Sequence, residues 1–293
     1  MLDERTRQRR ARTWVYLAVT GLVLALLVAG LLNAALNPPT PIPGPAGSGS
    51  GVGEGPGPGP ASGAAPSTGG EWDLAGEAAL AATPMPGVAA AAASPQVIGT
   101  RSAGAAITIP AAISHGPLVE EGFPPTAEGA IGQLAALDTV ELTDLNPQTY
   151  AAAYRSISLP GAPDPADTPL GSEVAQLYGR VSVAASDPVP IFSRWQLAGA
   201  QIKGSTDGGA YVVACVLGEL QAAAHNNAAA GVGDCQALRY VTDLAAGSLV
   251  SGGQWRLAPG PAAAAAPDTW PGSDAFAEAG YRPIQTTAGS VPG

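Results

Sequence analysis

The chain has 293 residues, of which 46% are hydrophobic and only 12% are charged, and its formal net charge is −10. The first 13 residues hold five of the 13 basic and two of the 23 acidic residues, so the remainder carries a net charge of −13. This acidic remainder excludes the broad basic face that nucleic-acid binding requires, and no nucleic-acid partner is expected.

Residues 14–36 contain no charged side chain. As a helix rising about 1.5 Å per residue they would span about 34 Å, enough to cross a bilayer. We therefore predict a single transmembrane helix at 14–36, with the lipid bilayer as its partner. Residues that fit this topology are the preceding arginines and two aromatic residues at the membrane interface, namely Arg5, Arg7, Arg9, Arg10, Arg12, Trp14 and Tyr16.

The arginines predict that residues 1–13 form a cytoplasmic tail and that the rest lies outside the plasma membrane. The alternative is a cleaved signal peptide, whose apolar core is about 7–15 residues long and ends at a small-residue cleavage site. The apolar run here is longer, and its best candidate site, Asn33–Ala35, is a poor match. We expect the segment to be retained as a signal-anchor of a single-pass protein.

Residues 37–95 are predicted to be a disordered linker rich in Pro, Gly and Ala. Within 37–70, proline and glycine fill 20 of 34 positions, so the segment cannot bury enough apolar surface to offset its ordering entropy. As a flexible coil it would span about 30 Å. Residues 71–82 could form a short helix with Trp72, Leu74 and Leu80 on one side, although ordinary linker is the preferred interpretation.

Residues 96–287 are predicted to fold as one domain, followed by a flexible tail at 288–293. Ile107, Ile109 and Ile113 suggest extended chain at its entrance. Three helices should follow. The first has Thr126 as its cap, the second has Asn146 as its cap with Pro147 at the first position and Pro160 as its stop, and the third has Ser172 as its cap.

After Pro188 the pattern becomes that of strands. Four segments are separated by turns rich in Gly or Asn: VPIFSRWQLAGAQIKG, GAYVVACVLGEL, CQALRYVTDL and QWRLAPG. Helices followed by strands indicate an α+β fold, with three helices packed on a curved antiparallel sheet of about four strands.

Cys215 and Cys235 are the only cysteines. A metal site with His225 and Asp234 lacks the usual Cys-x-x-Cys spacing, and an exported thiol nucleophile would oxidise easily, so a disulfide is predicted. A disulfide across antiparallel strands would make paired positions sum to 450, so Tyr211 would face Arg239. Residues 218–232 would then form a loop.

The sequence offers no catalytic, metal or cofactor site. His115 and His225 stand in loop-like sequence, and we expect both to be exposed. Asp138, Glu141 and Asp144 surround a predicted helix end and are expected to face water. No nucleophile elbow, phosphate loop or His-Glu-x-x-His motif is present.

Three tryptophans have two interpretations. Trp195, Trp255 and Trp270 could line a ligand pocket in the domain. They could equally be core residues, because Trp195 alternates with Ile191 and Leu197 as on one buried sheet face.

Four motifs resemble an uncharacterised group of bitopic membrane proteins of high-GC Gram-positive bacteria that are linked to conjugative elements. These motifs are GFPPTAEGAIGQLAAL, GDCQALRYV, QWRLAPGP and WPGSDAFAEAGYRPI, and they cover about residues 100–284. The resemblance implies a cone-shaped α+β domain like that of nuclear transport factor, ketosteroid isomerase and the inner-membrane scaffold of type IV secretion systems. It implies no catalytic residues.

Three functional interpretations follow. The favoured one is a non-enzymatic, membrane-anchored assembly component of the cell envelope, in a conjugation or secretion apparatus, whose partners are other envelope proteins or further copies of itself. The second is an envelope module that binds a lipid or another apolar ligand. The third is an exported enzyme resembling an isomerase. No cofactor is expected in the first case.

Overall fold

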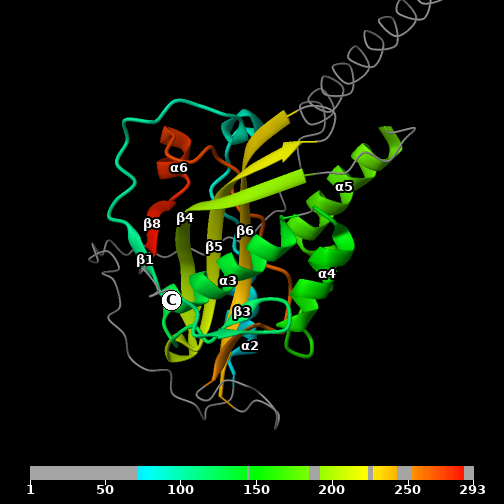
Figure 1. Ribbon diagram of the computed structural model, residues 1–293. Coiled ribbons are helices and arrows are strands. Elements are labelled where there is room, and N and C mark those ends of the chain that lie inside the picture. Colours follow the sequence, from blue (N-terminus) through cyan, green and yellow to red (C-terminus); the bar gives the residue numbers. More distant parts are fainter. Residues whose placement is uncertain (1–71, 144, 185–191, 224–226, 243–252, 287–293) are drawn as a thin grey trace, which may run out of the picture. The chain divides into compact units, whose positions relative to one another are not determined.

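The computed structural model describes residues 72–143, 145–184, 192–223, 227–242 and 253–286 (Figure 1). The predicted transmembrane helix at 14–36, the cytoplasmic tail and the linker up to residue 70 lie outside these residues. Within the described part of the chain, no helix is both long and apolar enough to cross a membrane.

The fold is α+β, with a curled mixed sheet and helices on its surface. The elements in chain order are α2 (Leu74–Ala82), η1 (Ala90–Ala93), β1 (Ile107–Ile109), β2 (Ser114–His115), β3 (Glu120–Glu121), α3 (Ala127–Glu141), α4 (Pro147–Ser156), η2 (Pro165–Asp167), α5 (Pro169–Ala184), β4 (Phe192–Thr206), η3 (Asp207–Gly209), β5 (Tyr211–Ala223), β6 (Asn227–Val241), β7 (Gln254–Leu257), α6 (Asp274–Glu278) and β8 (Arg282–Thr286).

The main sheet has six strands in the order β1-β8-β4-β5-β6-β7, and β2 pairs with β3 in a separate ladder. The prediction of about four antiparallel strands was therefore too simple. β1 runs parallel to β8, and this pair extends the sheet beyond β4. Register shifts between Leu197 and Gly199 and between Ile202 and Gly204 interrupt the β4–β5 ladder. Bulges of this kind increase the local twist of a strand, which accounts for the curl of the sheet.

Two of the three predicted helix starts are confirmed. Thr126 Oγ1 accepts a hydrogen bond from Gly129 N at 3.1 Å, and Asn146 Oδ1 accepts one from Gln148 N at 2.8 Å ahead of Pro147. The third start was wrong, because α5 begins at Pro169, and Thr168 Oγ1 accepts from Gly171 N at 3.1 Å. Proline suits the first helical turn, where no partner for its missing N–H is needed.

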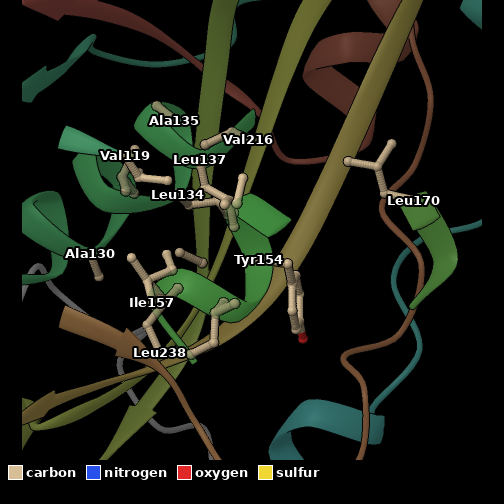
Figure 2. Packing of buried hydrophobic residues seen from close by; sticks show 14 of the residues in the cluster. Val119, Ala130, Leu134, Ala135, Leu137, Tyr154, Ile157, Leu170, Val216 and Leu238 are labelled. Atoms are coloured by element: carbon tan, nitrogen blue, oxygen red, sulfur yellow. The ribbon is translucent and has the colours of Figure 1, made fainter. Parts of the chain in front are cut away.

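The main core lies between the sheet and the helices α3, α4 and α5. We call this side of the sheet the inner face. Figure 2 shows Leu134 and Leu137 of α3 beside Val216 of β5, and Leu238 of β6 beside Ile157 in the same core. α3 is buried along most of its length, because the curled sheet and α4 enclose it. This packing holds the helices in place on the inner face.

The outer face has a smaller core of its own. It contains Tyr211, Val213, Cys215 and Leu217 of β5, covered by Ala81 of α2 and by the C-terminal segment. α2 is therefore part of the domain, and residues 72–95 differ from the disordered linker that the composition predicted. The backbone of this segment bonds the domain directly: Ala81 O accepts from Ala264 N at 2.9 Å, and Ala92 O accepts from Trp270 N at 2.6 Å.

The β5–β6 hairpin follows the predicted register throughout. Cys215 pairs with Cys235 and Tyr211 with Arg239, and the same register continues to Ala223 and Asn227. The expected loop at 218–232 was therefore wrong. Continued backbone pairing between the two strands outweighs the poor strand propensity of alanine, since a ladder within a sheet overrides the preference of individual residues.

Candidate functional site

The outer face is covered along most of its length. Leu80 of α2 lies over Gly204, where a Cβ would stand 2.7 Å from its Cδ1, and Phe276 of α6 lies over Gly199 in the same way. On β6, a Cβ at Gly231 would lie 1.8 Å from the carbonyl oxygen of Thr269, so only glycine fits there. The covering segments therefore approach the sheet closely up to these positions.

Beyond these positions the outer face is uncovered in the described part of the chain. The registers Phe192↔Ala223, Arg194↔Gln221 and Gln196↔Glu219 place these residues on one face of β4 and β5, and Gln221↔Ala229 adds β6. Alternate residues of a strand point to opposite faces, so Trp195 and Leu220 turn into the core instead. We call this set the hairpin-end face; Phe192, Arg194, Gln196 and Gln221 are exposed, and Glu219, Ala223 and Ala229 are half-buried.

Phe192 is the main apolar feature of the hairpin-end face, with 69% of its surface exposed. It lines a groove of about 480 Å³ together with alanines of the hairpin, among them Ala222, Ala223, Ala228 and Ala229. A single exposed apolar side chain is common on protein surfaces, and Ile113 is more exposed at 77%, so the combination of ring, groove and neighbouring charges is what makes this face a candidate contact surface.

The hairpin-end face carries one charge of each sign. Arg194 Nη2 donates to Gln196 Oε1 at 3.1 Å, and Glu219 Oε1 accepts from Gln221 Nε2 at 2.7 Å. Within the described residues, neither charged group has an ion-pair partner. Both charges are therefore held in place by neutral amides and remain available to a partner.

The opposite end of the hairpin is clamped by Arg239. Its side chain, 2% exposed, pairs with Glu77 of α2 and with Asp207 Oδ2, the latter at 2.7 Å. Its guanidinium carbon lies 4.1 Å from the centre of the Trp72 ring and 5.4 Å from that of Tyr211. Such cation–π contacts add to the ion pairs. Tyr211 also donates its hydroxyl to Glu77 O at 3.1 Å, so the clamp fixes α2 to the hairpin.

The clamp shifts the pKa values of its two acids in opposite directions. Burial raises the pKa of Glu77, although the hydrogen bond with Arg239 opposes this. For Asp207, burial also acts to raise the pKa, but the hydrogen bonds with Arg239 and Glu77 outweigh it and lower the pKa. Arg239 thus supplies the positive charge that two neighbouring acids require in a buried site.

A second group of acids lies on the inner face, and no ion-pair partner for it is found in the described part of the chain. Asp138 and Glu141 of α3 are 1% and 0% exposed, and none of their carboxylate oxygens has a hydrogen-bond partner among the described residues. Burial raises the pKa of both well above the ordinary range, and the nearby Asp234 adds to the effect. The prediction that these two acids face water was wrong, because the sheet encloses this side of α3.

Asp234 of β6 completes this acidic group. Gln236 Nε2 donates to both of its carboxylate oxygens, at 3.0 and 2.9 Å, yet burial raises its pKa to about 7. Burial raises the pKa values of the Tyr150 and Tyr154 hydroxyls. The nearby acids Glu141 and Asp234 raise them further. Among the described residues no cation contributes to the pKa shifts of Asp138 and Glu141, so burial and the mutual repulsion of the carboxylates both favour their protonated forms.

A small cavity of about 210 Å³ opens near the C-terminal end of α3. It is apolar except for Glu173 and Gln176, and its other lining residues are Leu142, Leu145, Leu170, Val174, Leu177, Leu220 and Val232. Asp138, Glu141 and Asp234 are not among the residues that line it. The buried acids and the cavity are therefore neighbouring but separate features.

The two cysteines lie where the sequence predicted. Their sulfur atoms are 1.96 Å apart and their Cα atoms 4.0 Å apart, at the distances of a cross-strand disulfide. Gly233 N donates to Asp268 Oδ1, and Ala237 O accepts from Ala258 N. The backbone N–H and C=O groups of alternate residues in β6, which include Cys235, therefore point away from β5. Cys235 falls at one of these non-hydrogen-bonded pairs, where side chains stand closest.

The remaining predicted site residues are dispersed. The side chain of His115 is 88% exposed and lies 3.5 Å from Glu120 Oε1, while His225 and Asp144 fall outside the described residues. Trp195 and Trp255 lie in the core, and Trp270 is half-buried beside η1. Among the described residues no three His, Cys, Asp or Glu side chains are grouped to hold a metal ion.

Sequence reasoning overlooked the Arg239 clamp, even though it placed Tyr211 opposite Arg239. Two acids, one arginine and two aromatic residues meet there, and Glu77 and Arg239 alone are 162 positions apart in the chain. The available signal was Arg239 at a position of the predicted strand that the disulfide register places on the same face as Cys235. A buried arginine requires acidic partners, so this residue indicates that acids from another segment pack against the strand.

Comparison with known proteins found no similar chain: no family model, no curated protein and no solved structure matches it.

Proposed function

We propose that the chain is a membrane-anchored, non-enzymatic assembly component of the cell envelope that docks its α+β domain onto other envelope proteins. Residues 14–36 would cross the plasma membrane with the N-terminus in the cytoplasm and the domain outside. The machine it would serve is a conjugation or secretion apparatus.

The observation that carries this proposal is the separation of the clamp from the hairpin-end face. Trp72, where the described chain begins, is held beside Arg239, and Figure 1 shows α2 near the lower ends of β5 and β6. From Tyr211 to Ala223 the strand covers about 40 Å at 3.3 Å per residue. The exposed Phe192 therefore lies at the far end of the sheet from the place where a tether would attach.

Two further observations support the proposal. The cysteine pair at disulfide distance is typical of domains outside the cytoplasm. The described residues that line the groove beside Phe192 include the polar Ser193, Arg194 and Gln221, so the surface has the mixed apolar and polar character of a protein contact.

The cavity near α3 supports a second candidate function, the binding of a small apolar ligand. At about 210 Å³ it is smaller than ligand pockets of about 300–1,000 Å³, and it would hold only a short chain or a single ring. Titrating the protein with short alkyl alcohols and following the NMR chemical shifts of the Leu142 and Leu177 methyl groups, which line the cavity, would test this second function directly.

The experiment for the main proposal is deletion of the gene in its own host, followed by measurement of DNA transfer to recipient cells and of protein secretion. Full-length protein should restore the lost activity. A variant lacking residues 41–70 should restore it poorly, because about 30 Å of reach is removed. His115→Ala serves as the matched control and should restore it fully. A deletion strain with normal transfer and secretion would contradict the proposal.

A further inference from the structure

We propose that the hairpin-end face pairs two copies of this chain around a two-fold axis. This inference deepens the proposed function by naming the partner, and it rests on that function only for the shared membrane that would concentrate the copies. Three properties of the hairpin-end face support the pairing, namely its shape, its charges and its position on the sheet.

The shape of the face is self-complementary. Phe192 protrudes at 69% exposure, Ala223 lies directly across from it on β5, and Ala229 of β6 lies diagonally from Ala223, opposite Gln221. The same groove contains both the aromatic ring and the small residues that could receive one. In a two-fold interface each copy presents the same patch, so a patch that carries both a protrusion and a recess satisfies this requirement by itself.

The charges are also self-complementary. Arg194 and Glu219 lie on the same face of neighbouring strands and are diagonal to each other, because Arg194 faces Gln221 and Glu219 faces Gln196. A two-fold axis between them would bring Arg194 of each copy to Glu219 of the other, forming two ion pairs. A partner with charges of only one sign would leave Arg194 or Glu219 opposite a like charge or without a partner.

The size of the face predicts a weak contact. Its seven residues are fewer than the roughly 20–30 per side in a standard stable interface. Two copies anchored in one bilayer would meet at a much higher effective concentration than free proteins, so a weak contact is sufficient. The face also lies at the end of the sheet away from the clamp, which leaves room for the two tethers.

The test uses charge reversal in the full chain, purified in detergent and studied by sedimentation over a range of protein concentrations. Arg194→Glu alone and Glu219→Arg alone should each weaken dimerisation at least tenfold, because like charges would face each other. A mixture of the two variants should dimerise again, because every pair across the axis would then be of opposite sign. The matched control is Arg155→Glu, a change to an exposed residue of α4, which should leave dimerisation unchanged.

The outcomes separate this inference from the proposed function. Wild-type protein that stays monomeric at every concentration, or single variants that dimerise like wild type, would overturn the pairing. Failure of the mixture to dimerise would also overturn it, provided that circular dichroism shows folded variants. None of these results depends on DNA transfer or secretion, so the proposed function is tested by its own experiment.

Discussion

The two faces of β6 bury charge in opposite ways. On the outer face, Arg239 sits between Glu77 and Asp207 and beneath Trp72, so each charge has a partner of opposite sign. On the inner face, Asp138 and Glu141 meet Asp234 with no cation among the described residues. In the outer group Arg239 favours the charged forms of the two acids and fixes α2, whereas in the inner group burial favours the protonated carboxyls.

The largest expected effect comes from breaking the outer group. Arg239→Met keeps much of the side-chain volume but leaves the buried Glu77 and the half-buried Asp207 without their cation. We expect the free energy of unfolding to fall by about 3–5 kcal/mol, measured by thermal or urea unfolding with near-UV circular dichroism. Adding Glu77→Gln should restore part of the loss, because one uncompensated acid is removed. A single variant as stable as wild type would contradict the clamp.

The cysteine pair offers a second test on the same outer face. Replacing both Cys215 and Cys235 by Ala opens a ring whose ends are 20 positions apart and should cost about 3 kcal/mol of unfolding free energy. Thiol labelling of the untreated wild type should detect no free cysteine, and two labelled thiols would rule out the bond. If the Arg239 clamp holds α2 on the sheet without help from the disulfide, the rate of proteolysis within α2 should be the same in the double variant and in wild type.

The inner group predicts a specific dependence on pH. The pKa values of Asp138, Glu141 and Asp234 are raised in the folded chain, so folding retains protons that the unfolded chain releases above about pH 4. Stability is therefore full in acid and falls as pH rises, by about 1.4 kcal/mol per pH unit for each retained proton. Asp234 contributes up to a pH of about 7, and Asp138 and Glu141 act in the same direction.

Asp138→Asn isolates one of these protons. In this variant the fall of unfolding free energy with rising pH should become shallower, by up to about 1.4 kcal/mol per pH unit where Asp138 releases its proton, as measured by urea titration at several pH values between about 4 and 9. Glu120→Gln, at an exposed position of β3, provides the control and should leave the slope unchanged. A wild-type chain whose stability rises from pH 7 to 9 would mean that the acids are ionised and compensated.

The smallest effect concerns the start of the helix that carries two of these acids. Thr126→Ala removes the hydroxyl that accepts from Gly129 N, and the unfolding free energy should fall by about 1 kcal/mol. Thr126→Ser keeps the acceptor and should restore most of the loss. Equal stability of the Ala and Ser variants would show that the cap contributes little.

Local features of the fold were predictable because they depend on neighbouring residues. Thr126 and Asn146 are helix caps as their sequence indicates, and the two cysteines determined the register of thirteen paired positions in the hairpin. The parallel β1–β8 pair was not predictable in this way. It joins residues 107–109 to residues 284–286, and neither short strand shows a pattern that identifies its partner.

The candidate site was less accessible to sequence reasoning, for a physical reason. Phe192 was assigned to a strand, but whether its face is covered depends on where α2 and α6 pack. Asp138 and Glu141 resemble ordinary surface acids on a helix, because α3 is rich in Ala and Gly and its buried side cannot be distinguished by hydrophobicity. In both cases tertiary packing decides exposure.

The most direct test of docking through the hairpin-end face is site-specific photo-cross-linking in cells. A photo-reactive amino acid would replace Phe192 in the full chain, and in a matched strain it would replace Arg155, whose side chain is 59% exposed on α4. We predict a cross-linked product of twice the chain's mass from position 192 and none from position 155. Equal cross-linking from both positions, or none from position 192, would contradict the account.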